Sequence, residues 1–222
     1  MRSTYILPLA VLVLNFSCST DSMNNSMQSQ EEILEAAAPK TQIKDSAFEQ
    51  ALIALGYDDV VDGTVITAAI SQVNSLVLDE EGISDLTGIE DFKLLDNLSV
   101  NGNRISELDL SSNTLLKFLF IENNELTTLI LPQTTVLEKV SALNNMLTEL
   151  NISANTGLQV LGLANNSIST IDISKIPNRI QLNTFSIEGN PLVCIKVNEA
   201  QLENIPNQWT KDPEDNFALM CN

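Results

Sequence analysis

The chain has 222 residues, enough for one domain of ordinary size with a tail, and its apolar fraction of 44% can supply a core. Its net charge of −18, from 29 acidic and 11 basic residues, argues against binding to nucleic acid or to an anionic membrane surface. The sequence contains no histidine, which removes the commonest general base and the usual zinc ligand.

The amino terminus has the pattern of a secretory signal. Arg2 precedes an apolar run over residues 5–14 that is too short to span a bilayer comfortably, and Ser17-Cys18 follow it. We therefore expect a signal peptide over residues 1–17. A cysteine at this place resembles the bacterial lipoprotein signal, which implies that Cys18 is acylated and begins the mature chain. Plain secretion is the alternative.

Two further segments precede the main part of the chain. Residues 18–40 are polar and low in complexity, so we expect a flexible tether. Residues 41–72 are expected to form an amino-terminal cap that contains a helix. Asp45-Ser46 can begin this helix, Gly56 can end it, and its apolar residues fall on one face: Phe48, Ala51, Leu52 and Leu55.

The acidic stretch over residues 58–63 raises the question of a calcium site. An EF-hand loop that begins at Asp58 would place Val60 at its third position and Ala69 at its twelfth, where oxygen ligands are required. We therefore expect Asp62-Gly63 to form a turn instead, before a strand-like segment over residues 64–67.

The centre of the chain repeats itself every 21 residues. Four segments share the pattern apolar-x-apolar-x-x-Asn-x-apolar, and they begin at Leu98, Leu119, Val140 and Leu161. A degenerate copy begins at Leu76, and a last copy begins at Phe185. A fixed period of this length is typical of a solenoid, in which each repeat stacks on its neighbours and buries a continuous core.

The repeat pattern resembles that of leucine-rich repeat proteins, over residues 73–193 and about six copies. This resemblance implies an α/β-class leucine-rich repeat solenoid, a curved horseshoe that is mostly β. Its short parallel strands would line a concave wall. It also implies that one asparagine per repeat points inward and bonds to backbone groups of the turn, which makes these residues structural: Asn103, Asn124, Asn145, Asn166 and Asn190.

Residues 194–222 are expected to form a carboxy-terminal cap. If Cys18 carries lipid, Cys194 and Cys221 remain as a pair in an oxidising compartment, and a disulfide between them would close the open end of the solenoid. Many leucine-rich repeat proteins end in such a cap. Trp209 is expected to fill the last turn. A catalytic thiol is the alternative, but the sequence offers it no histidine base.

Residues that flank the inward-pointing positions of each strand should face outward from the concave wall. In its middle they include a group of apolar and charged residues, which is a candidate binding surface: Phe118, Phe120, Leu143, Val160, Glu122 and Lys139. We expect no metal site and no cofactor, because the cysteines are widely separated and no pair of carboxylates recurs on the wall.

The sequence thus predicts a non-catalytic binding module of the bacterial cell envelope. It would be anchored to the outer membrane by its lipid alone, exposed at the surface, and monomeric. Its expected partner is a protein or a glycan, not a nucleic acid. The alternative is an accessory or scaffold subunit of an outer-membrane or periplasmic complex.

Overall fold

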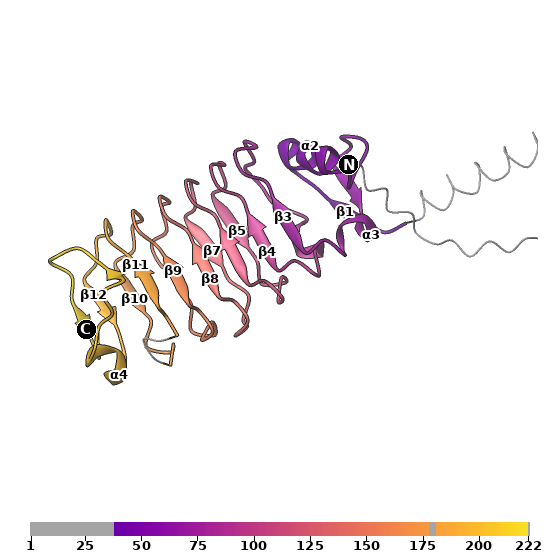
Figure 1. Ribbon diagram of the computed structural model, residues 1–222. Helices are drawn as coiled ribbons and strands as arrows, with labels where there is room; N and C mark the ends of the chain where they lie inside the picture. Colours follow the sequence, from indigo (N-terminus) through magenta and orange to yellow (C-terminus); the bar gives the residue numbers. More distant parts are fainter. Residues whose placement is uncertain (1–37, 178–180, 222) are drawn as a thin grey trace, which may run out of the picture. The chain divides into compact units, whose positions relative to one another are not determined.

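The computed structural model describes residues 38–177 and 181–221. Every helix and strand in these ranges belongs to one compact unit, Pro39–Asn222. The predicted signal peptide, the lipidation site Cys18 and nearly all of the predicted tether lie outside the described residues. Within the unit, the chain winds through successive turns of similar shape, with one strand of each turn stacked on the next (Figure 1).

These stacked strands form a seven-stranded sheet, which we call the main sheet. Its strands pair in parallel, and neighbouring residues lie one repeat apart: Leu98 pairs with Leu119, and Leu119 pairs with Val140. In spatial order the strands are β13 (Trp209–Thr210), β11 (Thr184–Ser186), β9 (Val160–Gly162), β8 (Lys139–Ser141), β6 (Phe118–Phe120), β4 (Asn97–Ser99) and β3 (Ser75–Val77). The prediction of a parallel-sheet solenoid of about six turns is therefore confirmed.

The repeated apolar positions build the core. Alternate residues of a strand point to opposite faces, so the middle residue of each strand and the residue two places later point inward. Leu119 and Ile121 of the β6 turn are both fully buried, as are Val140 and Ala142 one turn later. At the carboxyl end, Trp209 packs edge-to-face against Phe185 with 5.8 Å between ring centroids, so the tryptophan fills the last turn as predicted.

A second face lies on the other side of the core and consists of shorter, interrupted sheets. One contains β5 (Glu107–Asp109) and β7 (Thr128–Ile130), and the other contains β10 (Thr170–Asp172), β12 (Cys194–Lys196) and β14 (Phe217–Ala218). Residues 149–151 separate these two sheets and form no strand. Apolar and polar residues alternate along these segments, as in Glu107-Leu108-Asp109, and most of the repeats form a strand there.

The amino-terminal cap covers the first turn. It contains β1 (Lys40–Gln42), paired antiparallel with β2 (Thr64–Ile66), and the helices α2 (Ser46–Leu55) and α3 (Thr67–Ile70). A short 3-10 helix, η1 (Ile89–Asp91), follows in the first repeat. Phe48 of α2 stacks on Phe92 of that repeat with 6.3 Å between ring centroids, which joins the two cores.

Two details of the cap differ from the sequence prediction. Leu55, placed on the buried face of the helix, is 48% exposed because it lies at the very end of α2, where Gly56 adopts a φ of 82° and stops the helix. Glu49 is 2% exposed instead, and its carboxylate accepts hydrogen bonds from the amides of Asp62, Gly63 and Thr64. Asp62-Gly63, at the end of the acidic stretch, is therefore a turn held by a helix side chain.

Asp45 links the cap to the first repeat. One carboxylate oxygen accepts hydrogen bonds from the amides of Ala47 and Phe48 at the start of α2, and the other accepts the amide and hydroxyl of Ser84. Partial burial raises the pKa of Asp45, but the hydrogen bonds from Ser84, Phe48 and Ala47 outweigh it and lower the pKa below its ordinary value. The ionised form therefore stabilises the folded chain.

We predict that Asp45→Ala lowers the free energy of unfolding at pH 7 by about 2 kcal/mol, because it removes a helix cap and the bonds to Ser84. Since the folded-state pKa lies below the unfolded one, this contribution is present above about pH 4 and is lost as the pH falls further. Urea denaturation at pH 7 and pH 3 measures the difference. Asp59→Ala, at an exposed position nearby, is the control, and an equal loss in both variants would refute the capping role.

Candidate functional site on the main sheet

The predicted binding residues lie on the solvent-facing side of the main sheet. We call this surface the sheet wall. It consists of the outward residues of the seven strands and of the residue two places beyond each strand. Phe118 and Phe120 come from β6, Lys139 from β8 and Val160 from β9. Glu122 and Leu143 follow β6 and β8. The fold thus brings all six predicted residues together on three neighbouring turns of the solenoid.

The two phenylalanines differ in exposure. Phe118 is 37% exposed and, within the described residues, makes no aromatic or cation contact of its own. Phe120 is half-buried, because the Lys139 ammonium lies 4.5 Å from the centre of its ring. This is the geometry of a cation–π contact, in which the ring face attracts positive charge. Phe118 is therefore the free aromatic surface of the wall.

Leu143 and Val160 are also half-buried, so the apolar group is less exposed than the sequence indicated. Leu143 reaches over the neighbouring strand β9. A Cβ atom at Gly162 would lie only 2.6 Å from the Leu143 Cδ1 atom, so the glycine leaves room for the leucine side chain. These apolar side chains extend over the wall from β6 to β9, and we call them the apolar cluster; Phe118 is its most exposed member.

Glu122 belongs to a row of carboxylates that the sequence analysis did not single out. Its Oε1 atom accepts a hydrogen bond from the Ser141 hydroxyl at 2.5 Å. At the equivalent place, Asp79 accepts from the hydroxyl of Ser99 at 2.7 Å, and Glu188 accepts from the hydroxyl of Thr210 at 2.6 Å. The sequence does contain a signal for this row. An acidic residue stands two places beyond the strand of one repeat, and a serine or threonine stands on the strand of the next repeat.

The predicted structural asparagines line the turn that follows each main-sheet strand. Asn145 is representative: its Nδ2 donates to the carbonyls of Ile121, Ala142 and Leu143, and its Oδ1 accepts the Leu126 amide at 3.0 Å. The same arrangement recurs at the other four positions of the column, namely Asn103, Asn124, Asn166 and Asn190. These amides are committed to backbone bonds and are not available to a ligand.

A second asparagine column precedes the first and was not predicted. Asn123, Asn144 and Asn165 have φ angles of 56° to 57°, in the left-handed region that asparagine tolerates better than most residues. Their exposed amides also join to one another: Asn165 donates to Asn144, and Asn144 donates to Asn123. The recurring Asn-Asn pairs in the sequence are therefore one left-handed residue followed by one inward residue.

The polar residues of the second face also serve the turns. In a recurring Asp/Asn-x-Ser/Thr pattern, the first side chain accepts the amide of the third residue, as in Asp109–Ser111, Asn151–Ser153 and Asp172–Ser174. Asn113 and Asn155 are buried farther along and donate to carbonyls of the preceding repeat. These segments can be seen to recur in the sequence. Their hydrogen-bond partners cannot, because they lie one repeat away or are backbone groups.

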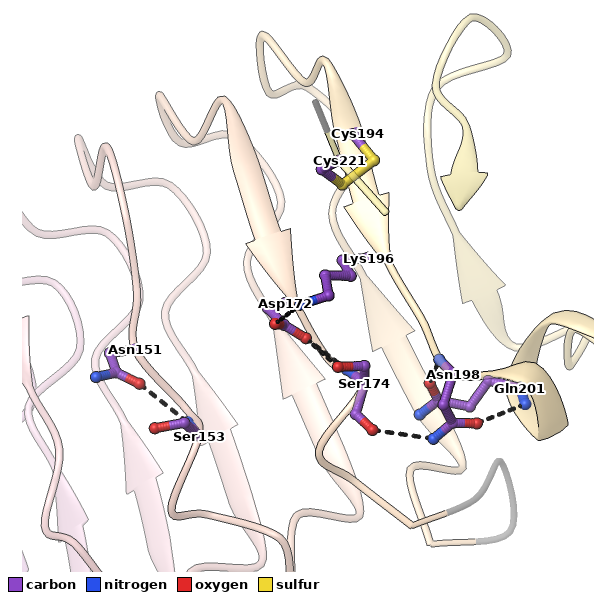
Figure 2. A network of polar contacts seen from close by, with 9 residues as sticks. All are labelled: Asn151, Ser153, Asp172, Ser174, Cys194, Lys196, Asn198, Gln201 and Cys221. Carbon is purple, nitrogen blue, oxygen red and sulfur yellow. Dashed lines mark hydrogen bonds and ion pairs between the residues drawn. A yellow bond between two sulfur atoms is a disulfide. The ribbon is translucent and has the colours of Figure 1, made fainter. Parts of the chain in front are cut away.

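The carboxy-terminal cap joins this network (Figure 2). The predicted Cys194–Cys221 disulfide is present, with 5.7 Å between Cα atoms. On the same strand Lys196 pairs with Asp172 at 2.8 Å, and Asn198 caps the short helix α4 (Glu199–Leu202) through a reciprocal bond with Gln201. The cap is therefore tied to the last repeats by covalent, ionic and hydrogen bonds.

A hollow of about 770 Å³ lies on the second face, where residues 149–151 separate the two sheets. Its lining includes Ile130, Asn151, Asp172 and Lys196. These three polar residues of the hollow are committed to bonds within the chain, and Ile130 is its exposed aliphatic side chain.

The acids with a raised pKa do not form a catalytic pair. Burial raises the pKa of Asp58 in the amino-terminal cap, and burial likewise raises the pKa of Asp215 in the carboxy-terminal cap. The two carboxyl groups lie in opposite caps. Among residues 38–177 and 181–221, no group of three or more Cys, Asp or Glu side chains could hold a metal ion. In the same ranges no helix has the length and apolarity needed to cross a membrane.

Known structures share this fold. The chain is similar to the functional domain of InlJ from Listeria monocytogenes, which includes a cysteine ladder, with a TM-score of 0.53 and 23% identity over 82% of the chain. It is also similar to an internalin, inlF, from Listeria monocytogenes, with a TM-score of 0.57 and 22% identity over 70% of the chain. The chain spans about half the length of these two structures, 49% and 50%. No protein-family model and no curated protein matches it.

The likeness establishes the fold. The solenoid is a leucine-rich repeat fold like that of the internalins, closed in this chain by the Cys194–Cys221 disulfide.

Proposed function

We propose that the chain is a non-catalytic leucine-rich repeat module of the bacterial cell envelope or surface that recognises a protein through its sheet wall. The observation that carries this proposal is the cluster of Phe118, Phe120 and Lys139 on a rigid parallel sheet. An exposed aromatic ring on a sheet that does not rearrange loses little conformational entropy on binding, which favours its use as an interface anchor.

The position of the asparagines supports the same reading. The inward and left-handed asparagine columns, the turn-forming acids of the second face and the capped helices use their polar groups within the chain. The wall keeps an aromatic ring in solvent, and an extended sheet surface of this kind suits a macromolecular partner. A glycan is the second class of ligand that such a surface could accept.

The proposal includes a location. We infer that the chain is secreted and anchored to the outer membrane through acylated Cys18, with the repeat unit at the cell surface. The signal-like pattern of residues 1–18 supports this inference. Labelled palmitate should enter the wild-type chain but not Cys18→Ala, and equal labelling of both would remove the anchor from the account.

We predict that Phe120→Asp reduces capture of the natural partner at least tenfold, because it places a charge in the apolar cluster and removes the contact with Lys139. Tagged wild-type and variant chains would be produced in the native cells, and proteins chemically cross-linked to each would be quantified. Ile130→Asp, on the second face, is the matched control and should capture as the wild type does. Both variants should keep the wild-type melting temperature within a few degrees.

The accessory-subunit alternative uses the same experiment. An envelope protein that depends on Phe120 for capture would indicate a subunit of a larger complex, and a protein or glycan from outside the cell would indicate adhesion. Equal capture by wild type and Phe120→Asp would show that the sheet wall is not the interface, and the proposal would fail.

A further inference from the structure

The row of carboxylates on the sheet wall is held in fixed positions. Asp79, Glu122, Glu188 and Asp212 occupy equivalent places, two residues beyond the strands of their turns. Three of them accept a hydroxyl from the next strand, and Asp212 accepts the Gly189 amide at 2.7 Å. In each case one oxygen is used, and within the described residues the second oxygen accepts no hydrogen bond. Each carboxylate is therefore held in position through one oxygen, and its other oxygen is available to a ligand.

Within the described residues none of these carboxylates forms an ion pair, although the Lys211 ammonium donates to the backbone carbonyl of Asp212. The four ion pairs found in residues 38–177 and 181–221 involve Asp62, Asp91, Asp96 and Asp172, none of which belongs to the row. The one cation among the outward strand residues in the middle of the wall, Lys139, lies over the Phe120 ring. The row therefore leaves a negative potential along the wall that a positively charged partner would compensate.

The row extends across the whole sheet, as an extended chain would, and among the described residues no three acids gather closely enough to hold a metal ion. Neighbouring strands of a sheet lie about 4.8 Å apart, so Asp79 and Glu122, two strands apart, are separated by about 10 Å. The seven strands from β3 to β13 span about 29 Å, the length of about nine residues of extended polypeptide. Between Glu122 and Glu188 the same row contains Leu143 and Ala164, so its middle is apolar.

The contact between Lys139 and Phe120 indicates what the aromatic group can bind. A lysine of the chain already lies over one ring, while the Phe118 ring beside it is exposed and carries no cation among the described residues. A lysine or arginine of a partner could occupy the Phe118 ring in the same manner, and the aliphatic part of its side chain would cover the apolar cluster.

We propose that the sheet wall binds an extended, positively charged polypeptide segment of about nine residues, with basic residues towards both ends and an apolar middle. The segment would lie across the strands, with its cations on the carboxylate row and over the Phe118 ring and its apolar residues on Leu143. This inference rests on the proposed binding function of the wall and specifies the chemistry of the partner.

The test uses the purified full chain and a fluorescent nine-residue peptide with two lysines at each end and an apolar centre. Fluorescence anisotropy at 50 mM salt should show binding that weakens strongly at 300 mM salt, because exposed charges are screened. A peptide with glutamates in place of lysines should not bind. A peptide with the same lysines but a polar centre should bind about fivefold more weakly.

Two matched double variants separate the wall from the overall charge. The wall variant Glu122→Gln with Glu188→Gln keeps an oxygen for the Ser141 and Thr210 hydroxyls, so its fold should be unchanged. The second-face variant Glu107→Gln with Glu149→Gln changes the net charge equally, at two exposed residues on the opposite face. We expect the wall variant to lose about fivefold in affinity and the second-face variant less than twofold.

Equal losses in both double variants, or no peptide binding at 50 mM salt, would overturn the inference. These results differ from a failure of the proposed function. If the peptide does not bind but Phe120→Asp still abolishes capture of the natural partner, the wall is an interface for a different class of partner. If neither effect is seen, the proposed function fails as well.

Discussion

Replacing Asn145 by leucine is expected to lower the free energy of unfolding by about 3 kcal/mol or more. The Asn145 amide is 8% exposed, and its Oδ1 atom is the acceptor for the Leu126 amide. Leucine leaves that donor buried without an acceptor and also removes the bonds to the carbonyls of Ile121 and Leu143. A buried unsatisfied donor costs about 1–3 kcal/mol, and the lost carbonyl partners add to this.

Chemical denaturation followed by circular dichroism measures this loss. Met146→Leu is the matched control, because Met146 is the next residue, is 46% exposed and should change stability by less than about 0.5 kcal/mol. The melting temperature of Asn145→Leu should fall clearly below that of Met146→Leu. If the two variants melt together, the asparagine column does not hold the turns.

The second large effect is expected at the carboxyl end. Cys194 and Cys221 close a loop with a sequence separation of 27, for which chain-entropy arguments give a stabilisation of about 3.5 kcal/mol. Opening this loop should first release the cap, because each turn of a solenoid is held mainly by its neighbours. Hydrogen exchange after reduction should therefore increase in β12 and β14 before it increases in β6 or β8.

The control for this prediction is the double variant Cys194→Ser with Cys221→Ser. It should melt as the reduced wild type does and should not respond to reductant. A wild-type chain whose cap exchange is the same with and without reductant would show that the disulfide contributes little to the cap.

Much of the fold could be predicted because one repeat period controls it. Each inward position meets the same position one repeat away, so a column such as Leu98, Leu119 and Val140 is visible in the sequence as a spacing. The disulfide could be predicted from the number of cysteines. Glu49 could not, because its amide partners are 13 to 15 residues away and depend on where α2 lies.

The sequence predicted where the candidate site lies, but not which of its side chains are exposed. The alternation of a strand places Phe118 and Phe120 on the same face, but it does not say which ring is covered. That depends on Lys139 one strand away, which lies over Phe120 and leaves Phe118 open. Leu143 is covered for a similar reason, since Gly162 on the next strand allows it to lie flat.

The contacts of the carboxylate row were also not predicted from the sequence. Asp79 and Glu188 resemble ordinary surface acids in the sequence, where acidic residues are abundant. Their common feature is a hydrogen bond to a hydroxyl one strand away, Ser99 for Asp79 and Thr210 for Glu188. The repeat period places each acid near a hydroxyl one strand away, but the hydrogen bond between them is seen only in the folded chain.

The central claim is that partners bind the sheet wall and not the second face. Site-specific photo-crosslinking in the native cells tests it most directly, with a benzophenone side chain placed at Phe118 or at Ile130, both exposed but on opposite faces. The account predicts a discrete cross-linked product from position 118, lost when Phe120→Asp is added, and none from position 130. A product from position 130 alone, or one from position 118 that persists with Phe120→Asp, would contradict it.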